Sequence, residues 1–153
     1  MTTFFAGLYH WWGMNPFYSR ALHNQLRGWD VTCTDFLGRP WYNYAGLTMI
    51  VVTVFIYALQ YHIVDSARFN KKSDLWIMAL VTMFLNFFIA FAISYNNLRT
   101  SNYCISDVIT IGDCIGFGVT NALWSVILLF FLTSVNLFRQ LSANCRHTTF
   151  WKP

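Results

Sequence analysis

The stretch LWIMALVTMFLNFFIAFAISYNNL, residues 75 to 98, contains no Asp, Glu, Lys or Arg. Two further stretches share this property, residues 40 to 64 and residues 114 to 138. About 20 helical residues, at about 1.5 Å rise each, cross the roughly 30 Å hydrocarbon layer of a bilayer. Each stretch is therefore long enough to cross a membrane. We expect an all-α integral membrane protein with three transmembrane helices.

The three stretches define the expected organisation of the chain. The spans are predicted at about 43–64, 73–95 and 112–138, within a transmembrane bundle over residues 41–139. Backbone groups in hydrocarbon must be satisfied within each segment, so the spans are predicted as helices. Trp41 and Trp76 lie near span starts, as in the aromatic belts at membrane interfaces. A basic C-terminal tail, residues 140–153, follows the bundle.

Residues 1–40 are predicted to form an N-terminal interfacial segment. Asn15 and Pro16 are typical of a helix start, with Asn as the cap and Pro in the first turn. After them, two faces at helical spacing predict an aromatic-rich amphipathic helix in the membrane surface. The apolar face is Tyr18, Leu22, Leu26 and Trp29, and the polar face is Arg20, His23, Asn24 and Arg27. A fourth span near residues 3–18 is the alternative, although glycines and a proline interrupt it.

Composition and charge narrow the class of partner. With 56% hydrophobic and only 10% charged residues, the chain lies outside the range of soluble domains, in which about a quarter of residues are charged. The formal net charge is +4, but no cluster of basic residues marks a nucleic-acid site. The expected partners are the lipid bilayer with its anionic headgroups, further copies of the chain in a homo-oligomer, and other membrane proteins.

The distribution of Lys and Arg predicts an orientation. With three spans, one side carries Arg20, Arg27, Arg39 and Arg99, and the other carries Arg68, Lys71, Lys72, Arg139, Arg146 and Lys152. Loops rich in Lys and Arg tend to lie in the cytoplasm. We therefore expect a multi-pass membrane protein with its N-terminus outside and its C-terminus cytoplasmic. A fourth span would instead place both termini on one side.

Each span carries small and amide side chains on one helical face. The expected pore-lining or helix-packing positions are Gly46, Thr53, Gln60, Thr82, Asn86, Gly118, Asn121, Ser125 and Asn136. Such residues turn toward protein neighbours in hydrocarbon, either to pack helices together or to line a water-filled path. Gly112-x-x-x-Gly116 and Gly118-x-x-x-Ala122 are spacings that let helices approach closely. Asp113 at the edge of the third span has the plainer interpretation of a solvated loop carboxylate. The alternative is that Asp107 and Asp113, repeated around an oligomer, form a charged mouth.

No residue pattern points to catalysis, a metal or a cofactor. Paired carboxylates, a Ser/His/Asp set, a phosphate-binding glycine loop and a HExxH helix are all missing from the sequence. We therefore expect no enzyme, no metal site and no cofactor. The four cysteines include no Cys-x-x-Cys pair. Free, packed thiols are the plainer interpretation, and a Cys104–Cys114 disulfide closing a small hairpin is the alternative.

Two functions follow from these features. The first is a small membrane protein that self-assembles into a homo-oligomer and forms an ion-conducting or membrane-permeabilising pore. Three helices are too few to enclose a lumen, so such a pore requires several copies around an axis. The second is a non-conducting scaffold or accessory subunit of a larger membrane complex. In topology alone, three spans with a basic tail are similar to phage holins and other small membrane-permeabilising proteins.

Overall fold

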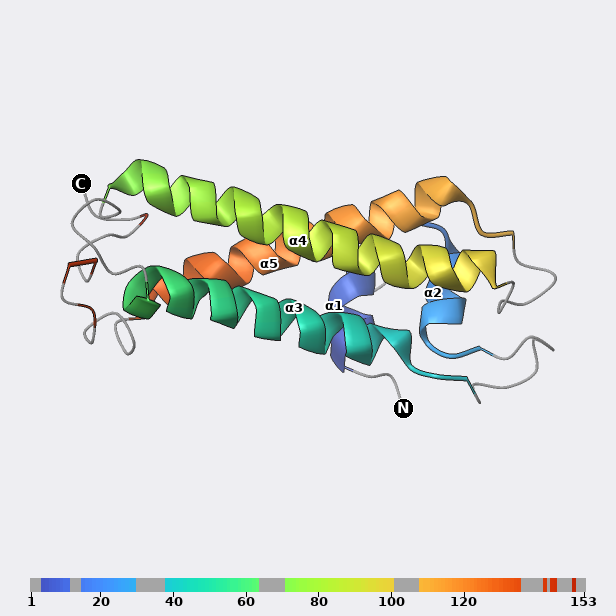
Figure 1. Ribbon diagram of the computed structural model, residues 1–153. Coiled ribbons are helices and arrows are strands. Elements are labelled where there is room, and N and C mark those ends of the chain that lie inside the picture. The colour runs from blue at the N-terminus through green and yellow to red at the C-terminus, as the bar shows by residue number, and fades with distance from the viewer. Residues whose placement is uncertain are drawn as a thin grey trace. The chain divides into compact units, whose positions relative to one another are not determined.

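The computed structural model describes residues 4–11, 15–29, 38–63, 71–100, 108–135, 142, 144, 145 and 150. Helices make up 81% of these residues, and no strand occurs among them. Two short helices, α1 (Phe4–His10) and α2 (Arg20–Leu26), precede three long ones (Figure 1). The long helices are α3 (Trp41–Ala58), which continues as a π-helical turn over Leu59–Ile63, α4 (Lys72–Arg99) and α5 (Ile111–Ser134).

The three long helices are each long and apolar enough to cross a membrane, over Trp41–Ile63, Lys72–Arg99 and Ile111–Ser134. The 28 residues of α4 reach about 42 Å at about 1.5 Å per residue. Asp74 lies in its first turn and Arg99 in its last, the arrangement that favours the helix dipole. The predicted helical class and its three apolar helices of spanning length are confirmed, with boundaries a few residues from those expected.

The chain divides into two compact units. Unit 1 comprises residues 1–48 and 86–121 and contains α1, α2, the beginning of α3, the second half of α4 and the beginning of α5. Unit 2 comprises residues 49–85 and 122–153. Each long helix therefore contributes residues to both units.

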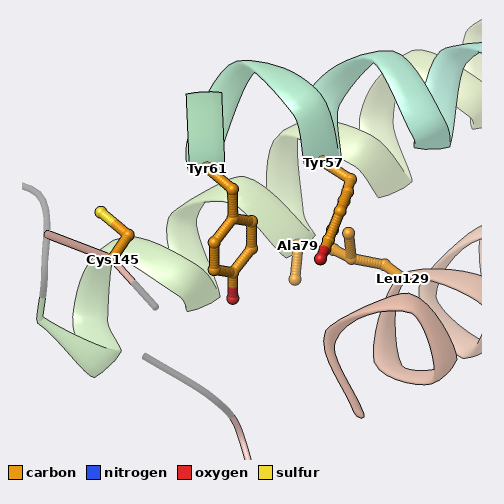
Figure 2. Packing of buried hydrophobic residues seen from close by; sticks show 5 residues of the cluster. All are labelled: Tyr57, Tyr61, Ala79, Leu129 and Cys145. Carbon is orange, nitrogen blue, oxygen red and sulfur yellow. The ribbon is translucent and has the colours of Figure 1, made fainter. Parts of the chain in front are cut away.

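The buried core of unit 2 gathers around two aromatic rings from neighbouring turns. Tyr57 and Tyr61 have ring centroids 4.7 Å apart. Ala79 from α4, Leu129 from α5 and Cys145 complete this cluster (Figure 2). Helices in hydrocarbon associate through close packing of this kind, because lipid chains are as apolar as the side chains themselves.

The burial pattern of α4 is inverted relative to that of a helix on a soluble protein. Its buried positions are Leu75, Ala79, Thr82, Asn86, Ala90, Ser94 and Asn97. Spacings of three and four residues place them in one stripe along the helix. Its exposed positions include Trp76, Ile77, Leu80, Val81, Phe84, Leu85 and Phe88. Small and polar side chains are therefore inside and large apolar ones outside, the reverse of a helix whose apolar stripe faces a core.

α2 begins later than the sequence predicts. Its first residue is Arg20, and Ser19 is the cap, whose hydroxyl accepts a hydrogen bond from the backbone of Leu22 at 3.4 Å. The prediction of Asn15 as helix cap is wrong, because the Asn15 side chain is engaged elsewhere. Its Oδ1 accepts from the backbone N–H of Phe17 at 2.8 Å. The segment after α2 turns at Gly28, whose φ of +92° is a conformation that favours glycine.

Candidate functional site

An aromatic cluster fills the interior of unit 1. Phe117 on α5 is fully buried, and three tyrosine rings surround it. Its ring centroid lies 5.4 Å from that of Tyr9, 5.8 Å from that of Tyr18 and 5.9 Å from that of Tyr42. The rings of Tyr9 and Tyr42 are also stacked on each other at 5.6 Å. Buried tyrosines need hydrogen-bond partners for their hydroxyl groups, so this cluster requires a polar network.

The hydroxyl groups of Tyr18 and Tyr42 belong to a chain of hydrogen bonds in which each donor and each acceptor can be assigned. Tyr18 donates its hydroxyl to the backbone carbonyl of Tyr9 at 3.0 Å. A hydroxyl has a single proton to donate, so the 3.0 Å contact between Tyr18 and Tyr42 requires Tyr42 to be the donor. His23 must then donate from Nδ1 to the Tyr42 oxygen, 2.8 Å away. The geometry thus selects the tautomer of neutral His23 that carries its proton on Nδ1.

A second chain of hydrogen bonds starts from the Tyr9 hydroxyl. Tyr9 donates to Oδ1 of Asn121, and Asn121 donates from Nδ2 to the backbone carbonyl of Asn86 at 2.7 Å. All three residues are fully buried. Burial raises the pKa of Tyr9 above its ordinary value, so the hydroxyl keeps its proton. These bonds join α1, α5 and α4 inside unit 1.

Asn15 anchors the chain between α1 and α2. Its Nδ2 donates to the Tyr9 carbonyl at 2.6 Å and to the hydroxyl of Thr120 on α5 at 3.3 Å. The Tyr9 carbonyl therefore accepts from both Asn15 and Tyr18. The described residues from Phe4 to Trp29, called the N-terminal segment from here on, are fastened to α5 at two successive polar positions, Thr120 and Asn121.

Two histidines stack within the N-terminal segment. His10, at the end of α1, has its ring centroid 3.8 Å from that of His23 on α2, with an interplanar angle of 19°. Burial is the main cause that lowers the pKa of His23 to about 4, with contributions from His10, Arg27 and Arg20. Burial, Arg20 and Arg27 also lower the pKa of His10. Both rings are therefore neutral at pH 7.

Asp113 is engaged within the chain. Its Oδ1 accepts from the backbone N–H of Ser19 at 2.7 Å. Its Oδ2 accepts from the backbone N–H and the hydroxyl of Thr110, each at 2.8 Å. Asp113 thus supports the first turn of α5 and holds the residue that caps α2. The other residue of the predicted charged mouth, Asp107, lies outside the described residues.

Glycines permit the N-terminal segment to approach the long helices. A Cβ added at Gly116 would lie 1.6 Å from the backbone oxygen of Phe17, and one added at Gly46 would lie 2.1 Å from the ring of Phe5. Of the two glycines in the Gly112-x-x-x-Gly116 spacing, Gly116 therefore contacts the N-terminal segment, whereas Gly112 is exposed. Gly118, from the second spacing, packs against Phe87 of α4 in the same way, with 2.9 Å to the ring.

The predicted pore-lining or helix-packing positions that the structure describes are all buried: Gly46, Thr53, Gln60, Thr82, Asn86, Gly118, Asn121 and Ser125. Some of their hydroxyls bond to carbonyls of their own helix, as Thr53 does to Met49 at 2.7 Å. Asn136 and Cys104 lie outside the described residues. Cys114 is a free and fully buried thiol.

Tyr18 and His23 belong to the predicted amphipathic helix, but the sequence does not predict their buried contacts with Tyr9, Tyr42 and His10. The placing of His23 on the polar face of that helix is wrong, because the structure buries it against His10 and Tyr42. The sequence feature that points to these contacts is that residues 1 to 19 contain no Asp, Glu, Lys or Arg. An apolar stretch too short to cross a membrane is compatible with a re-entrant segment. What such a segment contacts depends on distant residues.

Among the residues that the structure describes, no group of three or more His, Cys, Asp or Glu is placed to hold a metal ion. Comparison of the chain with protein-family models, curated proteins and solved structures found no match.

Proposed function

We propose that this chain is a multi-pass integral membrane protein that acts as a non-conducting, non-enzymatic scaffold or accessory subunit. One observation carries the proposal: the polar positions of its spans are buried within the single chain. Asn121 bonds to Tyr9 and to Asn86, and its neighbour Thr120 bonds to Asn15. A pore built from several copies needs polar side chains directed at a shared lumen. Here the polar side chains of Asn121 and Thr120 already bond to other segments of the same chain.

The outward positions support insertion into lipid. On α3 they include Leu47, Val51, Val54 and Phe55, and on α5 they include Ile115, Leu123, Ile127 and Phe131. Together with the outward face of α4, they form apolar surfaces of the kind that lipid chains contact. In an assembled complex, the same surfaces are available for packing against the apolar helices of other membrane proteins.

We propose that α2 of the N-terminal segment lies at the membrane surface and that α1 enters the membrane. α2 carries exposed Arg20 beside buried Leu22 and Leu26, as expected for a helix at the membrane surface. Tyr9 reaches Asn121, and the rise from residue 111 to residue 121 of α5 is about 15 Å. That is half the thickness of the hydrocarbon layer. α1 would therefore be a re-entrant helix, satisfied by buried partners as such segments must be.

The proposed orientation has the N-terminus outside and the C-terminus in the cytoplasm. It follows from the excess of Lys and Arg around residues 68–72 and in the C-terminal tail. Reporter tags added separately to the two ends, with their accessibility measured in intact cells, test it. An accessible C-terminal tag would reverse the proposed orientation.

A homo-oligomeric pore is the second candidate, and the position of the N-terminal segment favours it. Removal of Tyr9 and Asn15 would take away the partners of Thr120 and Asn121 on α5. Several copies with these polar side chains freed could enclose a lumen. A conducting state of this kind requires the N-terminal segment to leave unit 1.

Two measurements on the purified full chain separate the candidates. Native mass spectrometry in lipid is expected to give a lone protomer, and planar bilayers are expected to show no conductance above that of a bilayer without protein. A homo-oligomer of defined size with reproducible single-channel steps would overturn the first proposal and support the second.

A further inference from the structure

The histidine pair of unit 1 has an arrangement that opposes protonation. Both rings belong to the N-terminal segment, and a centroid distance of 3.8 Å brings their charges together if both bind protons. The charged groups that act on the two rings are Arg20, the first residue of α2, and Arg27, its C-cap. Tyr42 from α3 accepts the His23 hydrogen bond. Among the described residues, no carboxylate appears among these groups.

We propose that His10 and His23 form a proton-operated latch, in which the neutral stacked pair holds α1 inside unit 1 and protonation of the pair releases it. Two imidazolium rings in this position would repel each other and the two guanidinium groups. Separation of α1 from α2 and α3 relieves that repulsion and restores water around the rings. Tyr9 and Asn15 would leave α5 in the same movement.

The direction of the pH dependence follows from the shifted histidines. The pKa of His23 is about 4 while α1 is docked, and its ordinary value is about 6.5. Protons therefore bind more weakly to the docked form. Protons have little effect on docking above pH 6.5, and they increasingly favour release as the pH falls from 6.5 toward 4. From pH 7.5 to pH 5, His23 alone lowers the ratio of docked to released protein by up to about 30-fold, and His10 acts in the same direction.

The latch does not depend on conduction. If the chain is a scaffold, acid would change the surface that it offers to a partner membrane protein. If it is a pore, acid would free Thr120 and Asn121 on α5 from their partners in the N-terminal segment. The experiment therefore measures release of α1 itself and not a current or a binding event.

Hydrogen–deuterium exchange of the full chain in lipid nanodiscs at pH 7.5 and pH 5 tests the proposal, with rates corrected for intrinsic pH dependence. In the unmodified protein, protection of the amides of α1 is expected to fall by ten-fold or more at pH 5. The double variant His10→Gln/His23→Gln keeps polar side chains but binds no proton, so its protection is expected to be the same at both values. His62→Gln, at an exposed histidine of the π-helical turn, is the control that should retain the response.

A second variant keeps the test decisive if the double variant does not fold. Arg20→Gln preserves both histidines and removes one of the charges that oppose their protonation. Its α1 is expected to remain protected to a lower pH than in the unmodified protein. Equal protection of α1 at both pH values in the unmodified protein would overturn the proposal. So would a full pH response in the double variant.

Discussion

The hydroxyl of Tyr9 donates a hydrogen bond to the side chain of Asn121, 112 positions later in the sequence. Asn121 in turn donates a hydrogen bond to the backbone carbonyl of Asn86 on α4. A side chain of α1 therefore satisfies an amide of α5. The partner that this amide needs in an apolar environment is supplied by the chain itself.

Substitution of Tyr9 by Phe removes the donor and leaves Oδ1 of Asn121 buried without this partner. We expect Tyr9→Phe to lower the free energy of unfolding by about 1 kcal/mol, the usual scale for a hydrogen bond between membrane helices. Reversible unfolding in mixed micelles measures it. Tyr44→Phe is the control, because Tyr44 is half exposed on α3. Equal losses in the two variants would contradict the assigned role of the Tyr9 hydroxyl.

The bond between Tyr9 and Asn121 should also appear as a coupling energy between the two residues in a double-mutant cycle. Asn121→Leu leaves the Tyr9 hydroxyl unpaired, and the double variant Tyr9→Phe/Asn121→Leu removes both partners. We expect the double variant to be less destabilised than the sum of the two single variants. Phe88→Leu, on the exposed face of α4, should have little effect. Phe87 is a poorer control, because it packs on Gly118. Strict additivity of the two substitutions would argue against a direct interaction.

Two glycines in the same helix provide a matched steric test. A Cβ at Gly116 meets the backbone oxygen of Phe17 at 1.6 Å, whereas one at Gly112 meets only Thr110 Oγ1 at 3.4 Å. We expect Gly116→Ala to destabilise the fold by about 1 to 3 kcal/mol, as overpacking does. Gly112→Ala should be neutral or slightly stabilising, since Ala favours helix. Thermal unfolding of the two variants side by side checks the difference. Similar melting temperatures would mean that the N-terminal segment does not lie against Gly116.

Gly46→Ala is expected to be milder than Gly116→Ala. The atom that the new methyl group meets belongs to the Phe5 side chain, which can rotate away more easily than backbone. The same thermal measurement ranks the three glycines, with Gly116 the most sensitive and Gly112 the least. A larger loss at Gly46 than at Gly116 would show that Phe5 has no free rotamer.

Stability should decrease in acid because of the stacked histidines. Their pKa values are lowered in the folded chain, so the unfolded chain binds more protons and stability is lost as the pH falls below 6.5. His23 contributes at most about 1.4 kcal/mol per pH unit between 6.5 and 4. Denaturant unfolding at pH 7.5, 6 and 5 measures the slope. His23→Gln should flatten it, and an unchanged slope would assign the dependence to other groups.

The long helices were predictable because their signal is local. A charge-free stretch of sufficient length predicts a helix long and apolar enough to cross a membrane without reference to any other residue. The stripe of Thr82, Asn86 and Ser94 follows from spacing alone. The contacts of the N-terminal segment are different. Asn15 has the sequence signature of a helix cap, but bonds to Phe17, Tyr9 and Thr120 compete for its side chain. Asp113 resembles a loop carboxylate until its bond to Ser19 is known.

The link between Tyr9 and Asn121 also constrains the order of events during synthesis. α1 leaves the ribosome before α4 and α5, yet it reaches its partner on α5 only after translation has passed residue 121. Until then the nascent chain carries an apolar helix whose polar contacts do not yet exist. A translation product truncated before Asn121 should therefore keep its beginning accessible to protease, and the completed chain should protect it.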